Sequence, residues 1–302
     1  MRVIRADALG FCAGVKRTVD LALEAAQTAA QTTTLPAERE TASRLSVRTR
    51  LFTMGPLIHN SRALRDLERL GFSVLDEYHL PETLSGSVTV IRAHGIGPQT
   101  ERELLGRGTK IIDATCPKVR KSQLKARELR EKGYAVFIAG EKNHGEVRGI
   151  RMFAPDSLVV EDETEAFNAA NALFLKNKTV KTAIIGQTTI SEREYTAIYS
   201  AVKRIFPNLE VYNTICGATK SRQDALSELC AKTDALIIAG DTASSNTRRL
   251  LAIAEKSGKP AWIACGAADL PPEIKNYGSI GLSAGTSTPD NVIGEIEAAL
   301  LE

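Results

Sequence analysis

Three cysteines of this chain share one local pattern, and their thiols could together hold a metal centre. The segments that begin at Cys12, Cys116 and Cys216 read CAGVKR, CPKVRK and CGATKS, so each fits C-x-x-[VT]-[KR]. Successive members lie 104 and 100 residues apart. Each cysteine follows a strand-like apolar run and precedes a helix-like segment, where exposed backbone N–H groups favour a thiolate. The pattern therefore predicts three equivalent thiolates at three helix starts.

Three converging thiolates suit two kinds of centre. One is a zinc ion with three sulfur ligands and an open fourth position. The other is a cubane iron–sulfur cluster in which three irons are bound by cysteine and the fourth is open to substrate. Spacings of about a hundred residues match no local zinc or ferredoxin pattern, so the sequence leaves both open. Cys230 and Cys265 lie on helix-like and strand-like runs without polar neighbours, and we expect them in the core.

Polar side chains gather in the segments that follow the strand-like runs. Three of the four histidines lie there, His59 in GPLIHN, His94 in RAHGIG and His144 in GEKNHGEV, whereas His79 lies in a solvated loop. Neutral or cationic donors at the ends of parallel strands suit phosphate oxygens. No GxxxxGK[ST] or strand-borne GxGxxG is present. The predicted phosphate-binding set is completed by Thr188, Ser244, Ser245, Asn246 and Ser287.

One carboxylate, Glu146, lies in such a loop beside a histidine. Next to an open metal position it could pass protons to a leaving hydroxyl. A solvent-exposed glutamate that caps a helix is the alternative for the same residue.

The elements that must position these residues alternate between short β-branched runs and segments of helical period. Such alternation predicts an α/β fold with mostly parallel sheets covered by helices. The repeat predicts three similar α/β units arranged pseudo-threefold around a central metal centre, over residues 1–115, 116–215 and 216–302. Residues 27–50 lack apolar periodicity and are expected to form an irregular insertion. Strands are expected within 88–95, 109–116, 134–141, 181–188, 235–241 and 260–266.

Bulk properties exclude several classes of protein. The 302 residues are 43% hydrophobic and 25% charged with a net charge of +3, which is typical of a globular protein and predicts no nucleic-acid binding. The basic segment 118–132 has the pattern of a solvated helix face. We expect neither a signal peptide nor a membrane span. Five dispersed cysteines without a CxxC pair favour a reducing compartment, the cytoplasm.

The motifs together resemble one known family, the 4-hydroxy-3-methylbut-2-enyl diphosphate reductases of the non-mevalonate isoprenoid pathway. The matching segments run in the family's order from residue 10 to 290: GFCAGV, GPLIHN, AHG, DATCP, KNHGEV, GQTT, SSNTRRL and AGTSTPD. The resemblance implies one [4Fe-4S] cluster held by Cys12, Cys116 and Cys216, whose open iron site binds the substrate hydroxyl. It also implies a diphosphate pocket formed by His59, His94, His144, Ser244, Ser245, Asn246 and Ser287.

The same resemblance assigns Glu146 and Thr188 to the allylic hydroxyl, with Glu146 delivering protons. The implied reaction is a two-electron reductive dehydroxylation that gives isopentenyl and dimethylallyl diphosphate, with ferredoxin or flavodoxin as electron donor. Two features depart from the family: Gly145 stands where a proline is common, and the segment between Cys12 and His59 is long. Two other hypotheses stay open, a three-cysteine zinc hydrolase of a phosphorylated metabolite and a non-catalytic module that binds such a metabolite.

Overall fold

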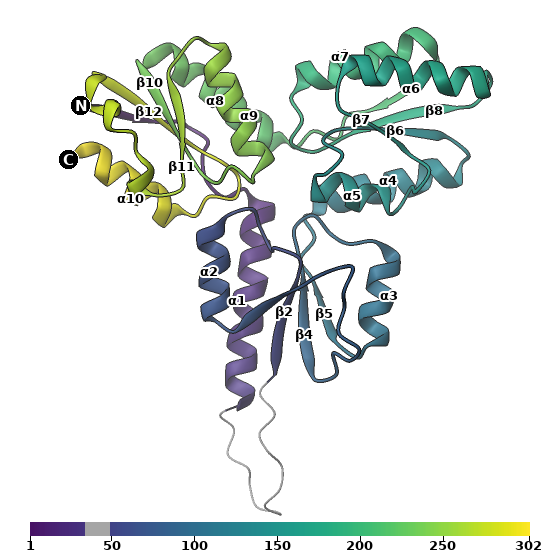
Figure 1. The fold of residues 1–302 in the computed structure, drawn as a ribbon, viewed down its shortest axis with the longest axis horizontal. Coiled ribbons are helices and arrows are strands. Elements are labelled where there is room, and N and C mark those ends of the chain that lie inside the picture. Colours follow the sequence, from purple (N-terminus) through teal and green to yellow (C-terminus); the bar gives the residue numbers. More distant parts are fainter. Residues whose placement is uncertain (34–48) are drawn as a thin grey trace, which may run out of the picture. The chain divides into compact units, whose positions relative to one another are not determined.

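Three four-stranded sheets, each wholly parallel, organise the part of the chain that the computed structural model describes, residues 1–33 and 49–302. Figure 1 shows helices on both faces of each sheet. The predicted α/β class with three parallel-sheet units is thus confirmed. The chain divides into two compact units, residues 13–117 and residues 1–12 with 118–302.

The unit of residues 13–117 contains one sheet with strand order β3-β2-β4-β5. Its core lies between the sheet and helix α3, where Met54, Ile91 and Leu104 are completely buried. The strands are β2 (Arg50–Met54), β3 (Phe72–Leu75), β4 (Ser87–Ile91) and β5 (Lys110–Asp113), and the helices are α1 (Ala13–Thr33), α2 (Ser61–Arg69) and α3 (Pro98–Gly106).

In the second unit, one sheet has the order β7-β6-β8-β9. Successive residues of β6 point to opposite faces: Phe137 packs with α6 and α7, whereas Ile138 packs with α4 and α5. Burial on both faces explains the continuous apolar runs. The strands are β6 (Ala135–Ala139), β7 (Leu158–Val160), β8 (Thr182–Gly186) and β9 (Glu210–Tyr212); the helices are α4 (Pro117–Glu131), α5 (Gly145–Arg151), α6 (Glu163–Lys176) and α7 (Glu192–Ile205).

The other sheet of this unit has the order β1-β12-β10-β11. Its N-terminal strand pairs with β12, so residues 2–5 share a sheet with strands of the predicted third unit; the boundaries at 115/116 and 215/216 stay a prediction. The strands are β1 (Arg2–Arg5), β10 (Ala235–Ala239), β11 (Ala261–Ala264) and β12 (Ser279–Ala284); the helices are α8 (Gly217–Lys232), α9 (Ser245–Lys256), α10 (Asp290–Leu301), η1 (Ala267–Asp269) and η2 (Pro272–Asn276).

The cysteine repeat is visible in the hydrogen bonds of the three sheets. Each sheet has a pair of central strands whose last residues lie side by side: β4 pairs with β2, β8 with β6, and β12 with β10. The cysteine contact lies beyond the end of the first strand of each pair, β4, β8 or β12. Two residues beyond that end, a backbone carbonyl accepts the N–H of a cysteine. The three bonds run from Cys116 to Ala93 (2.9 Å), from Cys216 to Thr188 (2.9 Å) and from Cys12 to Thr286 (3.3 Å). Equivalent turns therefore carry all three cysteines.

The predicted irregular insertion over 27–50 is wrong at both ends. Helix α1 continues to Thr33, and β2 begins at Arg50. The helix persists because its alanines have the highest helix propensity and because Ala22, Ala25 and Ala29 form a buried stripe at helical spacing. Residues 34–48 lie outside the described part of the chain.

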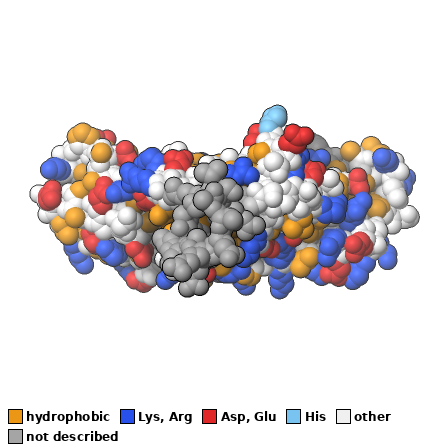
Figure 2. Space-filling model, turned by 90° about the horizontal axis from the view of Figure 1, so that it is seen from below, with side chains coloured by type: hydrophobic (Ala, Val, Ile, Leu, Met, Phe, Trp, Pro, Cys, Tyr) orange, Lys and Arg blue, Asp and Glu red, His pale blue; other side chains and the backbone are white. Residues whose placement is uncertain are grey.

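Charged side chains of both signs are interspersed on the face drawn in Figure 2. Helix α4, which covers most of the basic segment, buries Val119 and Leu129, and its Glu128 pairs with Lys125 (2.5 Å) and Lys132 (2.7 Å). The expected solvated face is confirmed, and one apolar residue of the segment, Leu124, is exposed as well. None of the helices in the described ranges is long and apolar enough to span a bilayer.

Candidate active site

The three predicted cysteine ligands are half-buried, and none of the five cysteines forms a disulfide. Cys230 is buried as expected, whereas Cys265 is half-buried, so the expected core position is wrong for Cys265. Each of the three predicted ligands immediately precedes the first residue of a long helix: Cys12 precedes α1, Cys116 precedes α4 and Cys216 precedes α8. None of these helices has an acidic residue in its first turn. Thiolates at such positions are stabilised by the exposed N–H groups. The donor set therefore fits a cysteine-bound metal centre.

A buried arginine reinforces two of these positions. Arg222 on α8 is 7% exposed, and its guanidinium donates to the carbonyl of Gly10 from Nη2 (2.7 Å) and from Nε (3.2 Å). Burial lowers the pKa of Arg222, whereas the neighbouring Cys12 and Cys216 sulfurs raise it. Arg222 therefore fixes the turn before Cys12 and places a positive charge beside two of the predicted ligands. It was not among the residues predicted from the sequence.

His144 ends the loop after β6 and caps helix α5. Its Nδ1 accepts the backbone N–H of Glu146 at 3.2 Å. Because Nδ1 acts as an acceptor, the proton of the neutral ring is on Nε2, which is then a donor. The histidine thus offers the hydrogen-bond donor that a phosphate oxygen requires. The residue that separates the two, Gly145, is the first residue of α5 and is buried.

Glu146 is buried, with 1% of its surface exposed, so the alternative of a solvent-exposed cap is wrong. Its Oε1 accepts the backbone N–H of Thr188 at 2.6 Å, and its Oε2 accepts the Thr188 hydroxyl at 2.7 Å. Burial raises the pKa of Glu146 from 4.5 to about 7, against the smaller opposing effects of these bonds and of Arg249. A carboxyl with a pKa near neutrality can both give and take a proton.

Ser244, Ser245 and Asn246 begin helix α9 and are almost fully buried. Ser244 caps the helix by accepting the N–H of Thr247 at 3.4 Å. Asn246 is 2% exposed, and neither the nitrogen nor the oxygen of its side-chain amide has a hydrogen-bond partner among the described residues. Unpaired buried amides are costly and rare in proteins. Asn246 therefore has a donor and an acceptor available to a ligand.

The hydroxyl of Ser245 lies in a network that the sequence did not predict. Gln187 Nε2 donates to it at 3.3 Å, and Arg249 and Glu141 also contact it. Gln187 belongs to the motif GQTT and Arg249 to SSNTRRL. The sequence therefore indicated both motifs, but it did not indicate that these two side chains contact Ser245. Ser287 is half-buried in the loop between β12 and α10.

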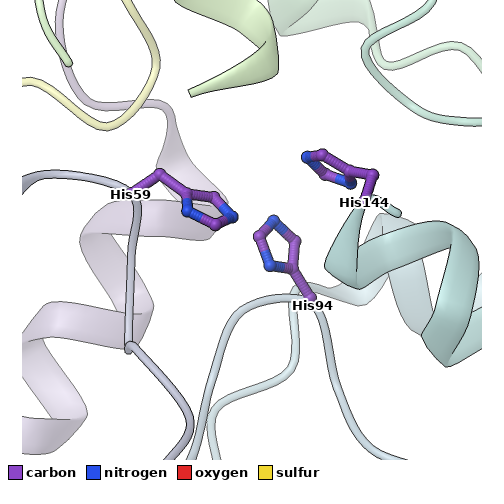
Figure 3. Close-up of side chains that lie close together, drawn as sticks. All are labelled: His59, His94 and His144. Carbon is purple, nitrogen blue, oxygen red and sulfur yellow. The ribbon is translucent and has the colours of Figure 1, made fainter. Parts of the chain in front are cut away.

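The unit of residues 13–117 carries the two remaining predicted histidines. His59 follows β2 and His94 follows β4, and their rings lie 4.9 Å apart between centroids at an angle of 35° (Figure 3). The residue after His59, Asn60, caps α2 by accepting the N–H of Ala63 at 3.0 Å. Neighbouring strand ends thus bring these two histidines together within their unit, next to the Ala93 carbonyl that accepts from Cys116.

The structure therefore groups the predicted residues within each unit. His144 and Thr188 both hydrogen-bond to Glu146, Arg222 lies near Cys12 and Cys216, and the ring of His59 lies beside that of His94. His79 is exposed and bonded to Asp76, as expected for a solvated loop. The binding and catalytic roles of the grouped residues stay a prediction.

Comparison with known proteins identifies the family to which this chain is similar. The family described as LytB protein matches residues 3–301. Among curated relatives, 4-hydroxy-3-methylbut-2-enyl diphosphate reductase of Treponema denticola is 41% identical over the full length of both chains. The enzyme of the same name from Caldanaerobacter subterraneus is 36% identical, with 98% of this chain and 95% of that protein covered.

Solved structures agree with the sequence comparison. The E-1-hydroxy-2-methyl-but-2-enyl-4-diphosphate reductase of Plasmodium falciparum matches with a TM-score of 0.85 and 26% identity, covering 100% of this chain and 88% of that one. A structure of (E)-4-hydroxy-3-methyl-but-2-enyl diphosphate reductase matches with a TM-score of 0.67 and 32% identity, covering 100% and 99%. Because the family match covers nearly the whole chain, the chain belongs to the LytB family of iron–sulfur oxidoreductases.

Proposed function

We propose that this chain catalyses the reductive dehydroxylation of (E)-4-hydroxy-3-methylbut-2-enyl diphosphate to isopentenyl and dimethylallyl diphosphate, the last step of the non-mevalonate isoprenoid pathway. The reaction consumes two electrons and two protons and releases the hydroxyl as water. The names of the full-length relatives support the reaction and its substrate. The observation that carries the proposal is the buried Glu146–Thr188 pair, in which burial raises the pKa of Glu146 to about 7.

A [4Fe-4S] cluster would be held by Cys12, Cys116 and Cys216, leaving one iron site open. Its chemistry would be electron delivery together with Lewis-acid polarisation of the substrate hydroxyl. The three half-buried thiols at helix starts support this ligand set. Arg222 supports it further, because a guanidinium beside two thiolates offsets part of the negative charge of such a centre.

The chain's own residues bind the diphosphate and move protons. His144 Nε2, the Asn246 amide and the Ser245 hydroxyl supply hydrogen bonds to phosphate oxygens, and Ser244, Ser287, His59 and His94 complete the pocket. Thr188 keeps the Glu146 carboxyl oriented through its hydroxyl and its backbone N–H. Protonated Glu146 gives its proton to the leaving hydroxyl, since a donor with a pKa near the working pH transfers protons efficiently.

Electrons would come from ferredoxin or flavodoxin, small carriers that reach the low potentials of such clusters. The five cysteines, none of them in a disulfide, support residence in a reducing compartment, the cytoplasm.

Anaerobic purification followed by iron, acid-labile sulfide and zinc analysis tests the cofactor. We expect a brown protein with iron and sulfide in equal amounts, and loss of both in Cys116→Ser. Colourless protein with one zinc per chain would instead support the three-cysteine zinc hydrolase.

A second experiment tests the role of Glu146. Glu146→Gln should keep the cluster and substrate binding but lower kcat by about 100-fold or more, the usual contribution of a general acid. Glu163→Gln is the matched control and should keep wild-type turnover, because it removes an exposed carboxylate that pairs with Arg204. Turnover of Glu146→Gln within about twofold of wild type would refute proton delivery by this residue.

A further inference from the structure

The Ser245 hydroxyl oxygen accepts hydrogen bonds from two side chains, and its own proton is donated to a third. Arg249 Nη1 donates to its oxygen, as does Gln187 Nε2 at 3.3 Å. Neither of these groups can accept a hydrogen bond. The single hydroxyl proton is therefore directed to an acceptor, and the carboxylate oxygen Oε1 of Glu141 occupies that place, closer to Ser245 than the Thr189 hydroxyl oxygen at 3.4 Å. Arginine and glutamine thus make Ser245 a donor toward an anionic oxygen.

The donors around Ser245 are held in place from both sides. The side-chain oxygen of Gln187 accepts the backbone N–H of Glu141 at 2.9 Å, so its nitrogen must face Ser245 and Thr189. Gly140 permits this approach, because a Cβ there would lie 2.6 Å from the Cβ of Gln187. Arg249 is 14% exposed in its side chain and pairs with Glu194 at 3.4 Å.

The Glu141 carboxylate is ionised and can move away from Ser245. Burial raises its pKa, but the Ser245 hydroxyl and the two arginines outweigh that effect and place the pKa below its ordinary value. Its carboxylate pairs with Arg248 at 2.5 Å and with Arg249 at 2.8 Å. One third of its side chain is exposed, so the carboxylate can turn into solvent when another anion takes its place.

We propose that Glu141 is an internal competitor for the substrate's diphosphate: its carboxylate holds the Ser245 hydroxyl and the two arginines until a phosphate oxygen displaces it. A phosphate oxygen is the same kind of acceptor as a carboxylate oxygen and suits the same arginine and hydroxyl donors. Glu141 thereby sets the affinity of the site for its anionic ligand. The inference rests on the proposed function through the assignment of Ser245 to the diphosphate.

The test measures binding of inorganic pyrophosphate by anaerobic calorimetry on protein of matched cluster content, with the substrate KM and kcat measured in parallel. Glu141→Gln should bind pyrophosphate about tenfold more tightly, because a hydrogen bond to a charged acceptor is replaced by one to a neutral amide. The substrate KM should fall by a similar factor with kcat unchanged or lower.

Two further variants separate direct competition from a change in charge. Glu194→Gln removes a carboxylate that pairs with the same arginine but does not contact Ser245, and glutamine keeps the capping box of α7. Its affinity should stay within about twofold of wild type. In a Ser245→Ala background, Glu141→Gln should give a clearly smaller gain, because the contested hydroxyl is gone and only the two arginines remain contested.

Equal or weaker pyrophosphate binding by Glu141→Gln would overturn the inference, and so would a full gain in the Ser245→Ala background. Either result leaves the proposed function standing if wild-type protein binds pyrophosphate and reduces the substrate. If wild-type protein binds no pyrophosphate and Ser245→Ala leaves the substrate KM unchanged, the diphosphate assignment of Ser245 fails, and the inference fails with it.

Discussion

Replacement of Glu146 by glutamine should change how the stability of the fold depends on pH. Burial raises the pKa of this carboxyl from 4.5 to about 7, so the folded chain holds the proton more tightly than the unfolded chain. The resulting stabilisation is fully present below pH 4.5 and is lost as pH rises through 7. A difference of about 2.5 pKa units corresponds to a loss of about 3 kcal/mol between pH 4.5 and pH 8.

Glutamine reproduces the protonated carboxyl without titrating. Its oxygen can accept the Thr188 N–H, and its nitrogen can donate to the Thr188 hydroxyl, which rotates to accept. Glu146→Gln should therefore match wild type near pH 5 and exceed it at pH 8 by up to about 3 kcal/mol, or about 5 °C in melting temperature for a chain of this size.

Differential scanning calorimetry at pH 5 and pH 8, on anaerobic samples of equal iron content, measures this effect. The relevant quantity is the change in the wild-type-to-variant difference between the two pH values, which cancels every other titrating group. Glu163→Gln on α6, an exposed site, serves as the control and should show no such change. A wild-type-to-variant difference that is the same at both pH values would show that Glu146 is already ionised at pH 5, and the argument from burial would fail.

Three further outcomes follow from contacts of the same unit. Thr188→Val removes the hydroxyl donor to Glu146 but keeps the backbone N–H bond, so the pH at which kcat declines should rise, as pH–rate profiles will show. Gly140→Ala should lower the free energy of unfolding by about 2 kcal/mol or more in thermal denaturation, since the φ of Gly140 is 158° and the new Cβ would meet Gln187. By contrast, the Cβ of Gly294→Ala in α10 would meet no neighbouring atom, so this change should stabilise the fold by about 0.5–1 kcal/mol. Arg222→Met should reduce the iron bound per chain, because the turn before Cys12 loses its donors; unchanged iron content would contradict the role given to this arginine.

The sequence predicted the parts of the fold that depend on local pattern. Apolar runs bounded by glycine and polar residues predicted the strands, because parallel strands covered on both faces are apolar throughout. Each of the six segments named from the sequence coincides with a strand to within a few residues, as 181–188 does with β8 (Thr182–Gly186). The prediction for 27–50 failed where an alanine-rich stretch lacked obvious periodicity, since alanine contributes little to an apolar pattern yet packs closely when buried.

By itself, the sequence determined which residues are candidates for chemistry: the repeated cysteines, the strand-end histidines and the polar loop motifs are short segments that can be recognised locally. Only the tertiary structure decided what surrounds them. It showed that Glu146 is buried against Thr188, that Arg222 reaches back across 212 residues to Gly10, and that Ser245 donates to Glu141 from 104 residues away. Such pairs are set by strand register and helix packing, and the desolvation that shifts a pKa exists only once the chain is folded.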